Sequence, residues 1–155
     1  MKLIEGVKVK DLKRIDDDRG WLMEMLRSDD PLFIRFGQVY ITTAKAGQVK
    51  AWHYHKKQTD SFVCVKGVAL VALYDSRENS STFGVVNYFE LSVEKPKLIQ
   101  IPNFVYHGYK AVGNEEASVI NCPTELYNYK EPDEFRIDPF KNDIPFDWEK
   151  GVIKK

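Results

Sequence analysis

Long apolar runs, cysteine and histidine are all scarce in this chain of 155 residues. No window approaches the length of a membrane span or of the apolar part of a signal peptide. The two cysteines, Cys64 and Cys122, are far apart in the sequence and lie in largely apolar segments, which favours buried thiols over a disulfide or a reactive thiol. We therefore expect a cytoplasmic protein that does not depend on disulfide bonds.

A net charge of one sign is also absent, because 23 lysine and arginine residues balance 23 aspartate and glutamate residues. No long run of like charge occurs either. This balance argues against nucleic acid or an anionic membrane as the main partner. The length fits one domain with one core, so we expect a single domain over residues 1–155.

Helical periodicity is weak, and strand signals dominate the chain. Segments rich in β-branched and aromatic residues alternate with turn residues; they cover residues 37–44, 48–54, 61–65, 68–74, 85–91, 97–101 and 117–122. Short strands at this spacing predict an all-β sandwich or barrel rather than a sheet with crossover helices. We expect few short helices, with a turn or two over residues 21–27 or 28–33. The polar tail, residues 137–155, is expected to wrap the barrel.

Histidine occurs three times, and all three residues fall in two short segments. His53 and His55 are two residues apart, so on a strand both side chains point to the same face. Asp60 follows shortly afterwards, and His107 lies in the second segment, residues 101–108. A chain that places its few histidines in this way is expected to gather them at one site.

The spacing around the first two histidines, G-x5-H-x-H-x4-D-x6-G over residues 47–67, resembles the first motif of the cupin superfamily. Asp60 stands where that motif usually has Glu. Residues 102–107 resemble the second motif, with Phe104 where Gly is usual. The resemblance implies a jelly-roll β-barrel with a polar pocket inside it.

A larger set of motifs, spread from about Gly6 to Trp148, resembles a short variant of the dTDP-4-dehydrorhamnose 3,5-epimerase family of nucleotide-sugar enzymes. The specific combination is D-x-R-G-x-x-x-E at residues 17–24, S-x-T-F-G at residues 80–84 and I-P-x-x-x-x-H-G at residues 101–108. The resemblance therefore rests on several separate motifs and covers most of the chain.

The resemblance implies an isomerase of deoxysugar and cell-surface polysaccharide biosynthesis, of the kind that makes dTDP-rhamnose. In such an enzyme a proton next to the 4-keto group of a dTDP-linked 6-deoxyhexose is removed and then returned from the other face of the sugar. The base position matches His53, and the acid position matches Tyr127, with Tyr129 as the close alternative. The reaction needs neither a cofactor nor a metal, and the enzyme is expected to be a homodimer.

The resemblance also implies a set of substrate-binding residues, of which two would hold the diphosphate of the nucleotide sugar. These two are Arg19 and Lys50, where lysine replaces the usual arginine and acts as a point charge. The complete set is Arg19, Glu24, Gln38, Lys50, His107 and Tyr129.

Three departures from the family keep a second interpretation open. Asp60 stands where the family usually has lysine, His55 is not typical of the family, and the C-terminal extension of the longer epimerases is missing. Imidazole and carboxylate groups together suit Mn, Fe, Ni or Zn. The alternative is therefore a metal-binding cupin that acts on, or binds, another small ligand. Its divalent transition metal would be held by His53, His55, Asp60 and His107.

Overall fold

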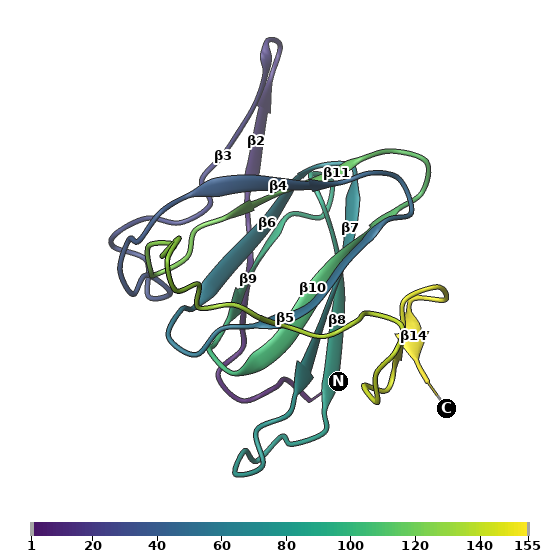
Figure 1. The fold of residues 1–155 in the computed structure, drawn as a ribbon. Helices are drawn as coiled ribbons and strands as arrows, with labels where there is room; N and C mark the ends of the chain where they lie inside the picture. The colour runs from purple at the N-terminus through teal and green to yellow at the C-terminus, as the bar shows by residue number, and fades with distance from the viewer. Residues whose placement is uncertain (1, 155) are drawn as a thin grey trace.

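The computed structural model describes residues 2–154, which form two five-stranded antiparallel sheets facing each other (Figure 1). The first sheet has the order β1 (Lys8–Asp11), β9 (Lys97–Ile101), β6 (Asp60–Lys66), β11 (Ala117–Asn121) and β4 (Tyr40–Ala44). The second has the order β12 (Phe135–Arg136), β5 (Val49–Tyr54), β10 (Val105–Val112), β7 (Val68–Asp75) and β8 (Val86–Ser92). Two hairpins complete the fold: β2 (Arg14–Asp17) with β3 (Gly20–Met23), and β13 (Phe146–Asp147) with β14 (Val152–Ile153).

Apolar side chains that alternate along the strands fill the space between the two sheets. Ala69, Val71 and Leu73 of β7 are fully buried there at every second position. Phe62 and Cys64 of β6 meet them from the other sheet. Because the side-chain period of a strand is two, this alternation turns one face of each strand toward the shared core.

The outer faces of the sheets are covered as well. Residues 137–154 cross the second sheet, where the rings of Phe146 and Trp148 lie 6.0 and 4.8 Å from that of Trp52. Residues 23–32 cover the first sheet through partly buried methionine and leucine side chains. The tail thus wraps the barrel as predicted. Strands that are covered on both faces need apolar residues on both, so their sequences are nearly continuous apolar runs.

The helical turns predicted over residues 21–27 and 28–33 are wrong, and the part of the chain that the structure describes contains no helix. Strand β3 replaces the first of them. Its hairpin with β2 is closed by the Asp17 carboxylate, which accepts hydrogen bonds from the backbone N–H groups of Arg19 and Gly20. This hairpin projects away from the two sheets (Figure 1). The chain after it is irregular, because its apolar side chains pack on the outside of the first sheet.

Every segment predicted as a strand holds one, whereas the predicted segments miss the long strand β10 and the shorter strands β1, β2, β3, β12, β13 and β14. The residues of β10 mix His107, Gly108 and Lys110 with apolar side chains, so no clear alternation is visible. The strand forms because it is paired on both sides, with β7 along its whole length and with β5 at three positions. Among residues 2–154, no helix is long and apolar enough to cross a membrane.

Candidate active site

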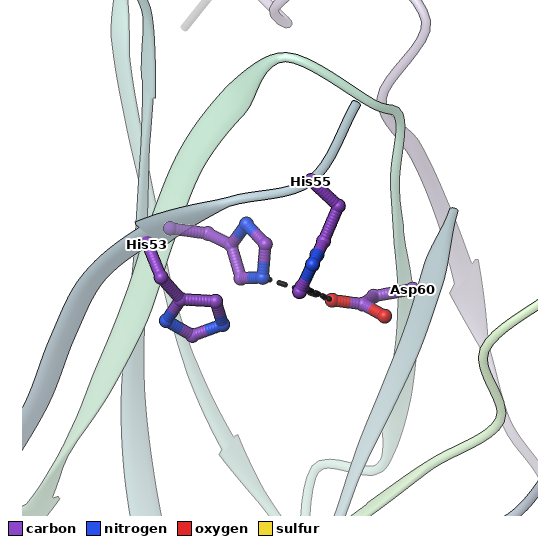
Figure 2. A group of neighbouring side chains, drawn as sticks. His53, His55 and Asp60 are labelled. Carbon is purple, nitrogen blue, oxygen red and sulfur yellow. Dashed lines mark hydrogen bonds and ion pairs between the residues drawn. The ribbon is translucent and has the colours of Figure 1, made fainter. Parts of the chain in front are cut away.

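The three histidines and Asp60 gather at one site, as their spacing predicts. His53 on β5 pairs directly with His107 on β10, and their ring centroids are 4.2 Å apart. His55 follows β5, and Asp60 begins β6 in the facing sheet. Figure 2 labels His53, His55 and Asp60 of this group. One possible ligand atom from each residue lies within 4.8 Å of those of the other three.

The carboxylate of Asp60 is fully buried and is the hydrogen-bonding centre of the site. Oδ2 lies 2.9 Å from Nε2 of His107 and 3.2 Å from Nε2 of His55. Oδ1 accepts hydrogen bonds from the side-chain amides of Gln58 and Asn121, at 2.6 and 2.9 Å. Burial alone would raise the pKa of Asp60, but the contacts with His107 and His55 hold that pKa well below its usual value. The carboxylate is therefore ionised.

His55 and His107 are each anchored at Nδ1 by a backbone carbonyl. Nδ1 of His107 lies 3.0 Å from the carbonyl oxygen of Val105, and Nδ1 of His55 contacts the carbonyl oxygen of Asp133. Each ring therefore turns Nε2 toward Asp60. Nε2 of His55 is buried without a hydrogen-bond partner, because its close approach to Asp60 lacks hydrogen-bond alignment. Burial lowers the pKa of His55, but the neighbouring Asp60 carboxylate outweighs burial and raises it.

Asp133 also fixes the loop that joins β5 to β6. Its carboxylate accepts hydrogen bonds from the backbone N–H groups of Lys56 and Lys57, each at 2.9 Å, and of Gln58, at 3.3 Å. Because the carbonyl group of the same residue anchors His55, Asp133 couples the position of that ring to the conformation of the loop.

His53 differs from the other two histidines, because neither of its ring nitrogens has a hydrogen-bond partner among the described residues. The residue lines a cavity of about 440 Å³. Burial, followed by the proximity of His107, lowers the pKa of His53 well below its usual value. The imidazole is therefore neutral near pH 7 and has a free lone pair on one nitrogen.

Lys50 reaches the same cavity as His53 because β5 contains a β-bulge. His107 and Tyr109 of β10 pair with His53 and Lys50, so β5 fits one extra residue between the two pairs. Without the bulge, strand alternation would place Lys50 and His53 on opposite faces. Instead, Nζ of Lys50 donates a hydrogen bond to Oγ1 of Thr42 in the facing sheet, at 3.2 Å.

The bulge depends on the glycine at position 108. A Cβ atom there would lie 2.3 Å from Cβ of Ala51 and 2.6 Å from the backbone oxygen of Lys50. Only glycine allows β10 to approach the bulged part of β5 this closely. The H-G pair of the second sequence motif thus provides both His107 and the space that the bulge of β5 needs.

The cavity beside His53 adjoins a wider one of about 820 Å³, since Tyr40, Glu134 and Arg136 line both. Arg136 pairs across the sheet with His53, and its guanidinium donates to both carboxylate oxygens of Glu134 at 2.9 Å. Burial raises the pKa of Tyr40 to about 12, so its hydroxyl group keeps its proton at neutral pH. Together the two cavities offer room for a ligand larger than a single sugar.

Tyr127 and Tyr129, the alternative acids, lie at the wider cavity with their ring centroids 5.0 Å apart. Gln38 lines this cavity as well. Tyr129 is 88% exposed and Tyr127 is 43% exposed, so Tyr127 is the more enclosed of the two. Neither tyrosine lines the smaller cavity beside His53.

Arg19 and Glu24 lie away from both cavities within one copy of the chain. The side chain of Arg19, at the tip of the β2–β3 hairpin, is 84% exposed and pairs with Asp17 at 2.7 Å. Glu24 is exposed and pairs with Arg27 at 2.9 Å. A single copy therefore brings together His53, Lys50 and His107 but leaves these two residues outside the site.

Sequence reasoning missed three residues of the site. Asn121 is a polar residue at the end of an apolar strand, and because buried polar groups need partners, its position was a usable signal. Gln58 lies between His55 and Asp60 but outside any strand, so strand alternation could not show that it points at the carboxylate. Arg136 belongs to a strand of two residues, which is too short to show a periodic pattern.

Known proteins resemble this chain over almost its whole length. The family model described as dTDP-4-dehydrorhamnose 3,5-epimerase matches residues 2–155. The chain belongs to this epimerase family. A "Spore coat polysaccharide biosynthesis protein" of Bacillus subtilis is 40% identical to this family member over 94% of the chain and 97% of its own length. A "Probable low-salt glycan biosynthesis epimerase" of Haloferax volcanii is 44% identical over 96% of both chains.

A solved structure agrees with this assignment. The crystal structure of a dTDP sugar isomerase from Desulfovibrio desulfuricans G20 matches with a TM-score of 0.88 and 33% identity. The match covers 94% of this chain and 92% of that one. It confirms the predicted cupin-like jelly roll. The protein is thus an epimerase-like isomerase of polysaccharide or glycan biosynthesis, in a family that acts on nucleotide sugars.

Proposed function

We propose that the protein epimerises a dTDP-linked 4-keto-6-deoxyhexose at a carbon next to the keto group, with His53 as the base. The observation that carries this proposal is the position of His53, which lines the 440 Å³ cavity without a hydrogen-bond partner for its ring. A general base must approach its proton to within about 2.6–3.2 Å. A ring nitrogen that no other group occupies is suited to that approach.

The keto group makes the neighbouring C–H bond acidic. When His53 takes the proton, the electron pair of the broken bond moves onto the carbonyl oxygen and forms an enolate. A second group then returns a proton to the same carbon from the opposite face. We assign this step to Tyr127, since it is more enclosed than Tyr129 and lies at the adjoining cavity. The sugar would lie between the two cavities, near Tyr40.

Lys50 is the residue of this site best placed to bind a phosphate group. Its ammonium group donates to the hydroxyl of Thr42 and has no carboxylate within ion-pair distance among residues 2–154. Arg136 adds a second positive charge to the same cavity, although Glu134 partly neutralises it. A diphosphate would therefore be held mainly by the charge of Lys50 in one copy of the chain.

A partner subunit would supply Arg19, the second residue expected to bind the diphosphate. We propose a homodimer in which the β2–β3 hairpin places Arg19 at the cavity of the other copy. The hairpin projects from the sheets (Figure 1), and its residues Trp21 and Leu22 are 47% and 58% exposed. Exposed apolar side chains on a projecting hairpin are suited to burial against another subunit.

Deuterium exchange tests the reaction directly. In deuterated water, the proton NMR signal of the hydrogen on C3 or C5 of a dTDP-4-keto-6-deoxyhexose should disappear as deuterium replaces that hydrogen. Since a general base contributes about 10²- to 10⁴-fold, His53→Ala should slow the exchange by that factor. Tyr127→Phe should retain exchange but slow inversion, whereas the matched variant Tyr129→Phe should not separate the rate of inversion from the rate of exchange. Exchange at the wild-type rate in His53→Ala would refute the assignment of the base.

A further inference from the structure

The Asp60 carboxylate opposes the proposed reaction unless a positive charge accompanies it. It is buried in the same cluster as His53, and its negative charge would repel an enolate formed beside that residue. Nε2 of His55 faces the same carboxylate at 3.2 Å, but no hydrogen bond is aligned between the two groups. A cation bound between these groups would offset the charge of the carboxylate and use the lone pair of Nε2 of His55.

Three side chains are arranged as metal ligands usually are. Oδ2 of Asp60 lies 2.9 Å from Nε2 of His107 and 3.2 Å from Nε2 of His55. Two ligand atoms bound at about 2.1 Å and at right angles around an ion are about 3.0 Å apart. The observed spacing therefore matches that of neighbouring ligand positions.

The contacts of the second ring nitrogen distinguish the two histidines that suit metal binding from the one that suits a general base. A metal-binding histidine almost always donates its other ring N–H to a carbonyl, a carboxylate or water, which fixes the ring. His55 and His107 have such anchors on the carbonyl groups of Asp133 and Val105. His53 has no anchor of this kind, although it lies in the same cluster.

We propose that His55, Asp60 and His107 bind one divalent first-row transition-metal ion, and that His53 beside them remains free to act as the base. Two imidazoles and one carboxylate leave coordination positions open for an oxygen of the substrate. When bound, such an ion would polarise the keto group and offset the negative charge of the enolate. This catalytic role rests on the proposed function, whereas binding of the ion does not.

Metal binding is tested without substrate. The protein, purified without an immobilised metal and treated with a chelator, is titrated with Co²⁺ while visible absorption and melting temperature are recorded. Elemental analysis then gives the metal content, expected at about one ion per chain for the wild type. His55→Gln and His107→Gln should each weaken binding at least tenfold. His53→Ala removes an imidazole from the same cluster and should leave the affinity within about twofold of the wild type, which makes it the matched control.

Each outcome supports or overturns a part of the proposal. A wild-type protein that shows no Co²⁺ absorption and no rise in melting temperature overturns the metal site and leaves the His53 mechanism untouched. Loss of binding in folded His53→Ala, checked by circular dichroism, makes His53 a fourth ligand and overturns the division of roles. Full deuterium exchange by the chelated enzyme overturns the catalytic role of the ion. Metal binding without exchange in either state overturns the epimerase function instead.

Discussion

Lys50 and His53 line the same cavity although they are three positions apart on β5, a spacing that regular strand alternation would place on opposite faces. The β-bulge between them reverses the strand alternation, so that one strand presents both a cation and a base to the cavity. Arg136 of β12 pairs with His53 from the other side of β5. The chemistry of the site therefore depends on backbone irregularity as well as on the identity of its side chains.

Gly108→Ala should disrupt this arrangement. The new Cβ atom would lie 2.3 Å from Cβ of Ala51, so the two strands must separate. We expect a loss of about 1–3 kcal/mol in the free energy of unfolding, measured by urea denaturation. Exchange should slow by about 10²-fold, because Lys50 and His53 lose their relative placement. Gly84→Ala, whose Cβ would meet nothing within 4 Å, should lose stability through its positive φ but keep its exchange rate.

Lys50→Met should weaken the binding of thymidine diphosphate, because it removes a charge that no carboxylate of the described chain neutralises. We expect about a tenfold rise in the dissociation constant, measured by calorimetry at low salt. Lys50→Arg should retain most of the affinity. Lys45→Met, an exposed residue outside both cavities, serves as the control for net charge. Equal losses in the Lys45 and Lys50 variants would mean that only overall charge matters.

The sequence predicted the cluster of histidines well, since His53 and His55 share a face through the period of two and His107 belongs to a separate, specific motif. It could not predict that Lys50 would join them, because the bulge is set by close packing against Gly108. The helical turns before residue 34 were wrong because burial against the first sheet decides the conformation there. The location of Arg19 outside the cavities is a property of the three-dimensional hairpin, which no motif spacing encodes.

Asp133→Ala should weaken metal binding at the proposed site, although it replaces none of the three proposed ligands. The carboxylate holds the backbone N–H groups of residues 56–58, and the loop they form precedes Asp60. Loss of a group that orients ligands typically costs about 10- to 100-fold in metal affinity. The Co²⁺ titration measures this loss, and Asp133→Asn, which keeps one acceptor oxygen, should show a smaller one. An unchanged affinity in Asp133→Ala would show that the loop does not position the ligands.

Asp75 should make stability depend on pH in the acid range. Its buried carboxylate accepts hydrogen bonds from Nε of Arg77 at 2.7 Å and from the hydroxyl groups of Ser80 and Thr82 at 2.6 Å. Burial raises the pKa of Asp75, but these partners outweigh burial and hold that pKa well below its usual value.

The sign of this pH effect follows from the lower pKa in the folded state. The ionised group contributes stability that is complete above the unfolded pKa of about 3.9 and is lost as the pH falls below that value toward the folded pKa. Asp75→Asn should lower the free energy of unfolding by about 1–3 kcal/mol at pH 7. The deficit should shrink at pH 3, as denaturant titrations at both pH values would show. A loss of the same size at both pH values would contradict the prediction. Asp18→Asn, which changes an exposed carboxylate, is the control.

The proposed homodimer makes a prediction about how Arg19 acts. The wild type should sediment as a dimer at micromolar concentration, and Leu22→Asp should shift it toward monomer, because it places a charge in the proposed contact.

Mixed dimers test whether Arg19 acts at the cavity of the partner subunit. The Arg19→Ala and His53→Ala variants should each show slower exchange when assayed alone. If Arg19 serves the cavity of the partner, a mixed dimer of the two variants has one site with both residues intact. Equal amounts, unfolded and refolded together, should then recover up to about a quarter of the wild-type exchange rate, since half of the dimers are mixed and each has one working site. Separately refolded variants, combined only in the assay, provide the control. If mass spectrometry shows mixed dimers but joint refolding does not raise the exchange rate, Arg19 acts at the cavity of its own chain or takes no part in the reaction.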